Sequence, residues 1–244
     1  HRAHASVVAI TNHVKTSAAG FLVQKEIEYL DKIVRSPRSP YVAILGGAKV
    51  SDKIPIIRNL LNKADIIMIG GAMAYTFFAA LGKGIGCSLV EEDKKELALE
   101  LISLAEKKKV RIELPQDHIL APSIEAPEKA EVFDRFPFPQ DRMGLDIGPR
   151  TREIFADLIS SAKTILWNGP MGVFEVDEFS EGTVSIARSV AESQAISIVG
   201  GGDSVAAIAK AGVGDRISHI STGGGASLEY ISNETLPGLE VLKK

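Results

Sequence analysis

Short apolar runs alternate along the chain with longer segments in which apolar residues recur at helical spacing. The clearest helical pattern lies in residues 91–109, where one apolar stripe is surrounded by Glu and Lys. That stripe consists of Leu97, Leu101, Leu104 and Ala105. Other helices are predicted for residues 18–34, 53–63, 151–161, 181–193 and 204–211. Runs rich in β-branched residues predict strands at residues 41–45, 65–69, 110–114, 164–167, 195–199 and 217–221.

Several predicted strands are apolar at both alternating sets of positions, which is typical of strands that are covered on both faces. Strands that alternate with helices imply a parallel sheet with right-handed crossovers. We therefore predict an α/β fold with a doubly wound, mainly parallel, Rossmann-like sheet in three αβα layers. Residues 115–150 are rich in proline and charge and break this pattern, so we expect a small irregular excursion there, such as a hairpin or flap.

Composition narrows the class of protein. The chain has 244 residues and a formal net charge of −3, which argues against nucleic acid or an anionic membrane as a main partner. Its one cysteine, Cys87, allows neither an intrachain disulfide nor a zinc site built on cysteines. No apolar run is long enough to span a bilayer, and the first residues lack a signal-peptide pattern. We expect a cytoplasmic protein.

Five of the predicted strand ends run directly into glycine. Ligands of open parallel sheets bind outside the carboxyl ends of the strands, where glycine allows close backbone approach and positive φ. Helices that follow such turns direct N–H groups and a positive dipole end at the crevice. Glycine is also common in turns without ligands, but five such turns favour a ligand that carries phosphate. The turns are 46–47, 70–71, 169–172, 200–202 and 223–225.

The common phosphate-binding fingerprints are absent, since neither G-x-x-x-x-G-K-[ST] nor G-x-G-x-x-G occurs. Candidate phosphate ligands follow the first glycine turn instead, where Lys49 and Lys53 lie four residues apart. If a helix begins near Ser51, Lys53 lies in its first turn, where a cation is unfavourable unless it faces an anion. Two solvated surface lysines are the alternative. The neighbouring Gly46 and Gly47 favour a functional role.

A carboxylate and a hydroxyl, those of Asp203 and Ser204, stand at a predicted helix start after Gly202. Both side chains are preferred helix N-caps. Asp203 can also be a magnesium ligand, because Mg²⁺ typically takes one or two carboxylates together with substrate phosphates. Glu175, which follows another glycine turn, is either an acceptor for ribose hydroxyls or an ordinary exposed glutamate.

A basic cluster formed by His1, Arg2 and His4 opens the chain. It is either half of an anion clamp, since arginine binds phosphate or carboxylate with two parallel hydrogen bonds, or a frayed terminus or tag remnant. The remaining histidines show no spacing to a partner and are interpreted as structural. They are His13, His118 and His219.

The stretches that carry these residues resemble the phosphoglycerate kinase family, and specifically the C-terminal half of its members. The resemblance covers essentially the whole chain, and the stretches occur in the family's order. They read HRAHAS, LGGAKVSDK, IGGAMAYTF, MGLDIGP, WNGPMGVFE, GGGDS and STGGGASLE, at residues 1–6, 45–53, 69–77, 143–149, 167–175, 200–204 and 221–229.

This resemblance implies reversible phosphoryl transfer between 1,3-bisphosphoglycerate and ADP, giving 3-phosphoglycerate and ATP in glycolysis. Members of the family have two Rossmann-like domains that close on a hinge. The N-terminal domain binds the glycerate, and the C-terminal domain binds the magnesium nucleotide. The resemblance thus implies Mg²⁺ as cofactor and ADP or ATP as substrate.

The resemblance also assigns residue roles. Lys49 would contact the transferring phosphoryl group, and Gly202 and Gly224 would stabilise the transition state through their N–H groups. Asp203 would hold Mg²⁺, and the glycerate would be touched by His1, Arg2 and His4. The residues assigned to the nucleotide are Lys53, Gly71, Gly144, Asn168, Gly169, Met171, Phe174, Glu175, Gly201 and Ser204, many members having Thr in place of the last.

The family pattern divides the chain into three parts. Residues 1–35 would be the tail of the N-terminal domain and the linking helix, 36–230 the nucleotide-binding domain, and 231–244 a segment that returns toward the N-terminal domain. Nearly all of that N-terminal domain is missing from this sequence. We expect the chain to fold and to bind ADP or ATP but to turn over little or nothing by itself. The resemblance implies a family whose members are usually monomeric. The alternatives are a stand-alone nucleotide-binding module without catalysis and a structural protein that binds nothing.

Overall fold

The computed structural model describes residues 1–243 and contains a six-stranded parallel sheet in the order β3-β2-β1-β7-β8-β9. The strands are β1 (Tyr41–Leu45), β2 (Ile66–Ile69), β3 (Arg111–Glu113), β7 (Thr164–Asn168), β8 (Ile196–Gly200) and β9 (His219–Ile220). The order reverses at β1, because the chain first builds outward to β3 and then returns to add β7 on the other side. This order and the helices on both faces confirm the predicted fold class.

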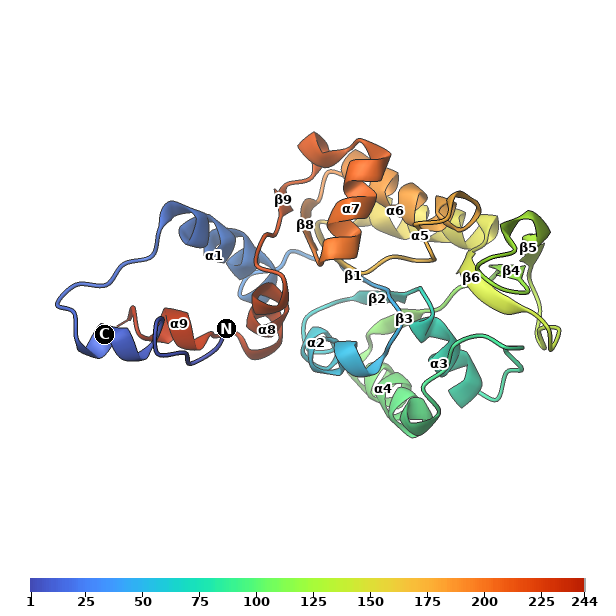
Figure 1. The fold of residues 1–244 in the computed structure, drawn as a ribbon, viewed down its shortest axis with the longest axis horizontal. Helices are drawn as coiled ribbons and strands as arrows, with labels where there is room; N and C mark the ends of the chain where they lie inside the picture. The colour runs from blue at the N-terminus through green and yellow to red at the C-terminus, as the bar shows by residue number, and fades with distance from the viewer. Residues whose placement is uncertain (244) are drawn as a thin grey trace.

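The helices are α1 (Phe21–Val34), α2 (Ile54–Leu60), α3 (Met73–Ala80), α4 (Lys95–Lys108), α5 (Pro149–Ser161), α6 (Glu181–Glu192), α7 (Gly202–Ala211), α8 (Gly225–Asn233) and α9 (Pro237–Glu240). Figure 1 shows α5, α6 and α7 on one side of the sheet and α2, α3 and α4 on the other. Among the helices in residues 1–243, none combines the length and the apolar character that crossing a membrane requires.

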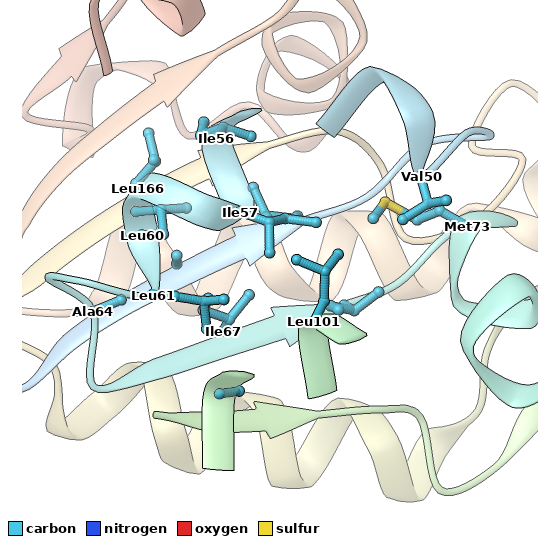
Figure 2. Close-up of a cluster of buried hydrophobic side chains, with 14 of the residues drawn as sticks. Val50, Ile56, Ile57, Leu60, Leu61, Ala64, Ile67, Met73, Leu101 and Leu166 are labelled. Atoms are coloured by element: carbon cyan, nitrogen blue, oxygen red, sulfur yellow. The ribbon is translucent and has the colours of Figure 1, made fainter. Parts of the chain in front are cut away.

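Alternate side chains of β1 enter two different cores. Ala43 and Leu45 pack with α1, α2, α3, α4 and α8, whereas Val42 and Ile44 pack with α5, α6 and α7. Figure 2 shows part of the first core, in which Leu60 and its neighbours on α2 lie over the strands of the sheet. Every residue of β1 is buried, as expected for a central strand that is covered on both faces.

The hydrophobic pattern predicts every strand of the main sheet to within about two residues, but it misses α3, α8 and the short α9. In α3 almost every side chain is buried, so no polar face marks a helical period. In α8 the helix begins inside a glycine turn, and glycine is a poor helix former. Both helices are nevertheless stable because their side chains pack into the first core.

The proline-rich segment contains a three-stranded antiparallel sheet in the order β5-β4-β6. Its strands are β4 (His118–Ala121), β5 (Glu131–Phe133) and β6 (Met143–Ile147). The expected excursion is therefore a small sheet in its own right. His118 is buried among aromatic rings, with ring centroids 4.9 Å from Phe138 and 5.6 Å from Tyr75, and burial lowers its pKa to about 4.

Asp146 joins this small sheet to the main domain. The side chain is buried, and its Oδ2 accepts a hydrogen bond from the backbone N–H of Gly182 at 2.7 Å, at the start of α6. A Cβ on Gly172 or Gly182 would lie 2.3 or 2.2 Å from Oδ1, so both positions require glycine. Among the described residues Oδ1 has no hydrogen-bond partner. Burial raises the pKa of Asp146 to about 7, although the hydrogen bond from Gly182 opposes this shift.

The raised pKa predicts a specific pH dependence of stability. Between about pH 4 and pH 7 the folded state binds more protons than the unfolded state, so the free energy of unfolding falls as pH rises. Asn at this position cannot ionise. We subtract the free energy of unfolding of the unchanged protein from that of Asp146→Asn. This difference should increase by up to about 1.4 kcal/mol per pH unit across this range and level off above it. Urea unfolding at a series of pH values measures the difference, and a flat profile would contradict the role of this carboxyl group.

Candidate functional site

The turns that follow β1, β2 and β7 are packed backbone against backbone. Hydrogen bonds join them, from Gly46 N to Asn168 O (3.0 Å), from Gly47 N to Pro170 O (3.0 Å) and from Gly71 N to Met171 O (2.9 Å). A Cβ on Gly46 would lie 2.0 Å from Pro170 O, and one on Gly169 would lie 2.2 Å from Gly46 O. These glycines are needed because any side chain would separate the turns.

A second group of glycines has open space where a Cβ would stand. No atom lies within 4 Å of that position at Gly47, Gly202, Gly224 or Gly225. Gly47 and Gly224 also have positive φ angles, of 104° and 53°, which favour glycine for a conformational reason. At these four positions the backbone is accessible at the carboxyl edge of the sheet, as a ligand that contacts main-chain N–H groups requires.

A cavity of about 200 Å³ lies between the packed turns and the small sheet. Five residues that the sequence assigns to nucleotide or metal binding line it, namely Gly71, Gly144, Met171, Glu175 and Asp203. The other lining residues are mostly apolar and include Ala48, Leu89, Leu145 and Val173. A largely apolar pocket with a few polar groups at its edge is the usual form of a small-molecule site.

Tyr75 is a cavity residue that sequence reasoning missed. Its hydroxyl would lie 1.8 Å from a Cβ on Gly144, so the tyrosine occupies the space that the glycine leaves. The hydroxyl also lies 3.3 Å from Nδ1 of His118. Burial raises the pKa of Tyr75 and keeps the phenol neutral. The signal available in the sequence was its position four residues after Gly71, in the first turn of α3.

The side chain of Lys53, which follows the glycine turn after β1, reaches the ends of β7 and β8. Its Nζ donates to Oδ1 of Asn168, whose Nδ2 donates to the carbonyl oxygen of Gly200 at 2.6 Å. Burial lowers the pKa of Lys53, while the nearby carboxylates of Asp52 and Asp203 raise it. Lys49 is exposed and stands on the same segment. The two lysines thus differ, since one is held against the strand ends and the other projects into solvent.

The helices α7 and α8 begin at this edge without a side-chain cap. Gly201 precedes α7 with a φ of 93°, and Asp203 is exposed in its first turn. Ser204 is buried, and its Oγ accepts a hydrogen bond from Gly169 N at 2.6 Å. The first N–H groups of an α-helix have no partner within the helix, so an uncapped start can bind an anion. Ser204 thus supports the β7 turn, and its contact with phosphate stays a prediction.

The turn that leads into α8 is held by α1. The Glu26 carboxylate accepts hydrogen bonds from Thr222 N (2.7 Å), Thr222 Oγ1 (2.8 Å) and Ser221 Oγ (2.8 Å), and it lies 3.0 Å from Nε2 of His219. Burial raises the pKa of Glu26, but these hydrogen bonds outweigh it and the pKa is lowered. His219 also stacks on Tyr29, with ring centroids 4.5 Å apart. This histidine is structural, as interpreted from the sequence.

The structure does not bring the basic cluster at the start of the chain to the cavity. His1, Arg2 and His4 are exposed, and His4 Nδ1 lies 2.7 Å from the hydroxyl of Ser6. His1 instead borders a different cavity of about 650 Å³, between the first twenty residues, α1, α8 and the segment around α9. Phe174 is buried in the second core and does not line the cavity of about 200 Å³. The roles assigned to these four residues stay predictions.

A family model described as phosphoglycerate kinase matches residues 1–234. Curated relatives of that name include proteins from Chlorobium limicola, 53% identical over 99% of this chain and 62% of its own length, and Acidobacterium capsulatum, 54% identical over 99% and 60%. The chain therefore spans less than two thirds of these relatives.

Solved structures agree with these sequence matches. Phosphoglycerate kinase from Coxiella burnetii superposes with a TM-score of 0.95 at 41% identity, covering 99% of this chain and 63% of the other. The enzyme from Pyrococcus horikoshii gives a TM-score of 0.81 at 34% identity, covering 100% of this chain and 61% of its own. The matched model, the sequence identities and the shared fold together mean that this chain belongs to the phosphoglycerate kinase family.

Proposed function

We propose that the chain provides the magnesium-nucleotide site of a phosphoglycerate kinase, which transfers a phosphoryl group reversibly between 1,3-bisphosphoglycerate and ADP. The observation that carries this proposal is the convergence of three features at one sheet edge. An apolar cavity, a lysine held at the strand ends and the uncapped start of α7 meet there. An adenosine moiety fits the cavity, and its phosphates would extend toward Lys53 and the first N–H groups of α7.

Individual roles follow from this placement. Met171 and the walls formed by Gly71 and Gly144 would border the adenine, and Glu175 at the exposed rim would accept hydrogen bonds from the ribose. Asn168, which already holds Lys53, would keep this lysine at the phosphates. Gly169 would contribute through the close packing of its turn rather than through a side chain.

Mg²⁺ fits the residues that are present. Asp203 offers an exposed carboxylate at the start of α7, close enough to Lys53 to oppose the lowering of that lysine's pKa by burial. One carboxylate together with phosphate oxygens is a common ligand set for Mg²⁺. The described residues contain no group of three or more metal-ligating side chains, so a magnesium ion here would take its remaining ligands from the nucleotide and water. When bound, it would neutralise charge on the phosphate oxygens.

Phosphoryl transfer suits these residues because it needs positioning and charge stabilisation more than covalent help. The exposed Lys49 would contact the transferring group, and the N–H groups of Gly202 and Gly224 would stabilise its equatorial oxygens. No general base is required, since the attacking carboxylate or phosphate oxygen carries no proton to remove. A protein that binds the nucleotide without catalysis is the alternative, because the basic residues at the start of the chain do not line the cavity.

Replacing Lys53 by Ala tests the phosphate site. ADP affinity should fall by about tenfold to a hundredfold, the contribution of a hydrogen bond between charged groups, while adenosine affinity should stay within about twofold. Lys107→Ala, which removes an exposed lysine from the end of α4, is the matched control. Calorimetry with both ligands in Mg²⁺ provides the values. Equal losses for ADP and adenosine would refute the assignment of Lys53 to the phosphates.

Replacing Lys49 by Ala tests catalysis. The assay measures ATP formation by a mixture of two proteins. One is this chain, and the other is the N-terminal part of a full-length relative, the part that this chain does not cover. The rate should fall by about 10²–10³-fold, as for removal of one donor to a transition state, with nucleotide affinity changed by less than about twofold. If the two-part mixture is inactive before any substitution while the chain binds MgADP, the stand-alone binding module is the better account.

A further inference from the structure

The loop between α3 and α4 carries a carboxylate, that of Glu91, which lies against residues 49–53, called here the lysine segment. Oε2 of Glu91 accepts a hydrogen bond from the backbone N–H of Ser51 at 3.0 Å, and Oε1 accepts one from the Ser51 hydroxyl at 2.5 Å. The backbone of Glu91 is itself fixed, because its N–H donates to the buried hydroxyl of Thr76 at 3.1 Å.

These contacts fall between the two functional lysines. Val50 and Ser51 lie in the short stretch that separates Lys49 from Lys53, at the point where the segment turns into the 3₁₀ helix Ser51–Lys53 and then α2. The N–H groups at that turn would otherwise be open to an anion. Glu91 occupies them, whereas the starts of α7 and α8 have no side-chain cap. The N–H of Ser51 is therefore not free to bind a phosphate while the carboxylate is in place.

The same loop also supports the opposite wall of the cavity. The hydroxyl of Ser88 accepts a hydrogen bond from the N–H of Gly144 at 2.9 Å, and the N–H of Cys87 donates to the carbonyl oxygen of Arg142 at 2.8 Å. Residues 87–91 therefore connect the lysine segment to the cavity wall on the small sheet.

We propose that Glu91 is a positioning residue, which fixes the backbone between Lys49 and Lys53 so that both ammonium groups meet the nucleotide phosphates. The proposal rests on the proposed function and deepens it. Within the described residues Glu91 forms no hydrogen bond with either lysine, so it acts through Ser51. Loss of Glu91 should consequently weaken the binding of ADP, which carries phosphates, and leave the binding of adenosine unchanged.

The expected direction separates positioning from simple electrostatics. Glu91 is a negative charge beside an anion site, so by Coulomb's law alone its removal would tighten ADP binding. If Glu91 positions the lysines, its removal frees the segment and weakens ADP binding. Glu92, the next residue, is exposed and pairs with Lys95. Among residues 1–243 it forms no hydrogen bond or ion pair with residues 49–53, so Glu92→Ala is a charge-matched control.

The test is calorimetric titration of the chain and its variants with ADP and with adenosine, in Mg²⁺. For Glu91→Ala we expect ADP affinity to fall about tenfold, equivalent to one hydrogen bond to a charged group, with adenosine affinity within about twofold of the unchanged chain. Glu92→Ala should change neither. Unchanged or tighter ADP binding by Glu91→Ala would overturn the proposal, and so would an equal loss for both ligands, which indicates only a damaged fold.

Ser51→Ala is the second variant, because it removes one of the hydrogen bonds and leaves the carboxylate in place. We expect a loss of ADP affinity of about threefold, smaller than for Glu91→Ala because the backbone N–H of residue 51 still donates to the carboxylate. If Glu91→Ala fails to fold, as judged by thermal unfolding, Ser51→Ala decides the matter, and no loss of ADP affinity would overturn the proposal. An unchanged chain that does not prefer ADP to adenosine would instead refute the proposed function itself.

Discussion

Close backbone packing between three turns is the constraint on which the rest of the site depends. The turns after β1, β2 and β7 approach until peptide groups of one touch those of the next, and a single Cβ at Gly46 or Gly169 would force them apart. Because these turns are fixed, the Lys53 segment begins at a defined point and the cavity has a rigid floor. Phosphoryl transfer relies on such fixed positioning, since misplaced charges stabilise a transition state poorly.

This constraint changes how the glycines are understood. From the sequence, all five glycine turns indicate close approach of a ligand. In the structure some of these glycines are needed for turn-to-turn packing, and others, such as Gly202 and Gly224, leave open space beside uncapped helix starts. Abundance of glycine at strand ends therefore has two physical causes. Only the second points to phosphate, and a sequence without coordinates does not distinguish them.

The sequence predicts the sheet, most helices and the gathering of Lys53, Gly71 and Asp203 at one edge, because these depend on local periodicity and on the geometry of parallel strands. Gly144 lies on the small antiparallel sheet, and only the resemblance to the family assigns it to the site. It does not predict contacts across long sequence separations. Glu91 reaches Ser51 over 40 residues, and Glu26 reaches Thr222 over 196, with no pattern that marks either carboxylate. The limits of the predicted parts, 1–35, 36–230 and 231–244, stay predictions.

A crystal structure of the chain with MgADP tests the central claim most directly. We predict that the phosphates lie at the start of α7, that the Lys53 ammonium leaves Asn168 for a phosphate oxygen, and that Mg²⁺ contacts Asp203. The adenine should occupy the cavity between Gly71 and Gly144. Phosphates found at the start of α2 in place of the Glu91 carboxylate, or a nucleotide bound in the larger cavity beside α1 and α8, would contradict this account.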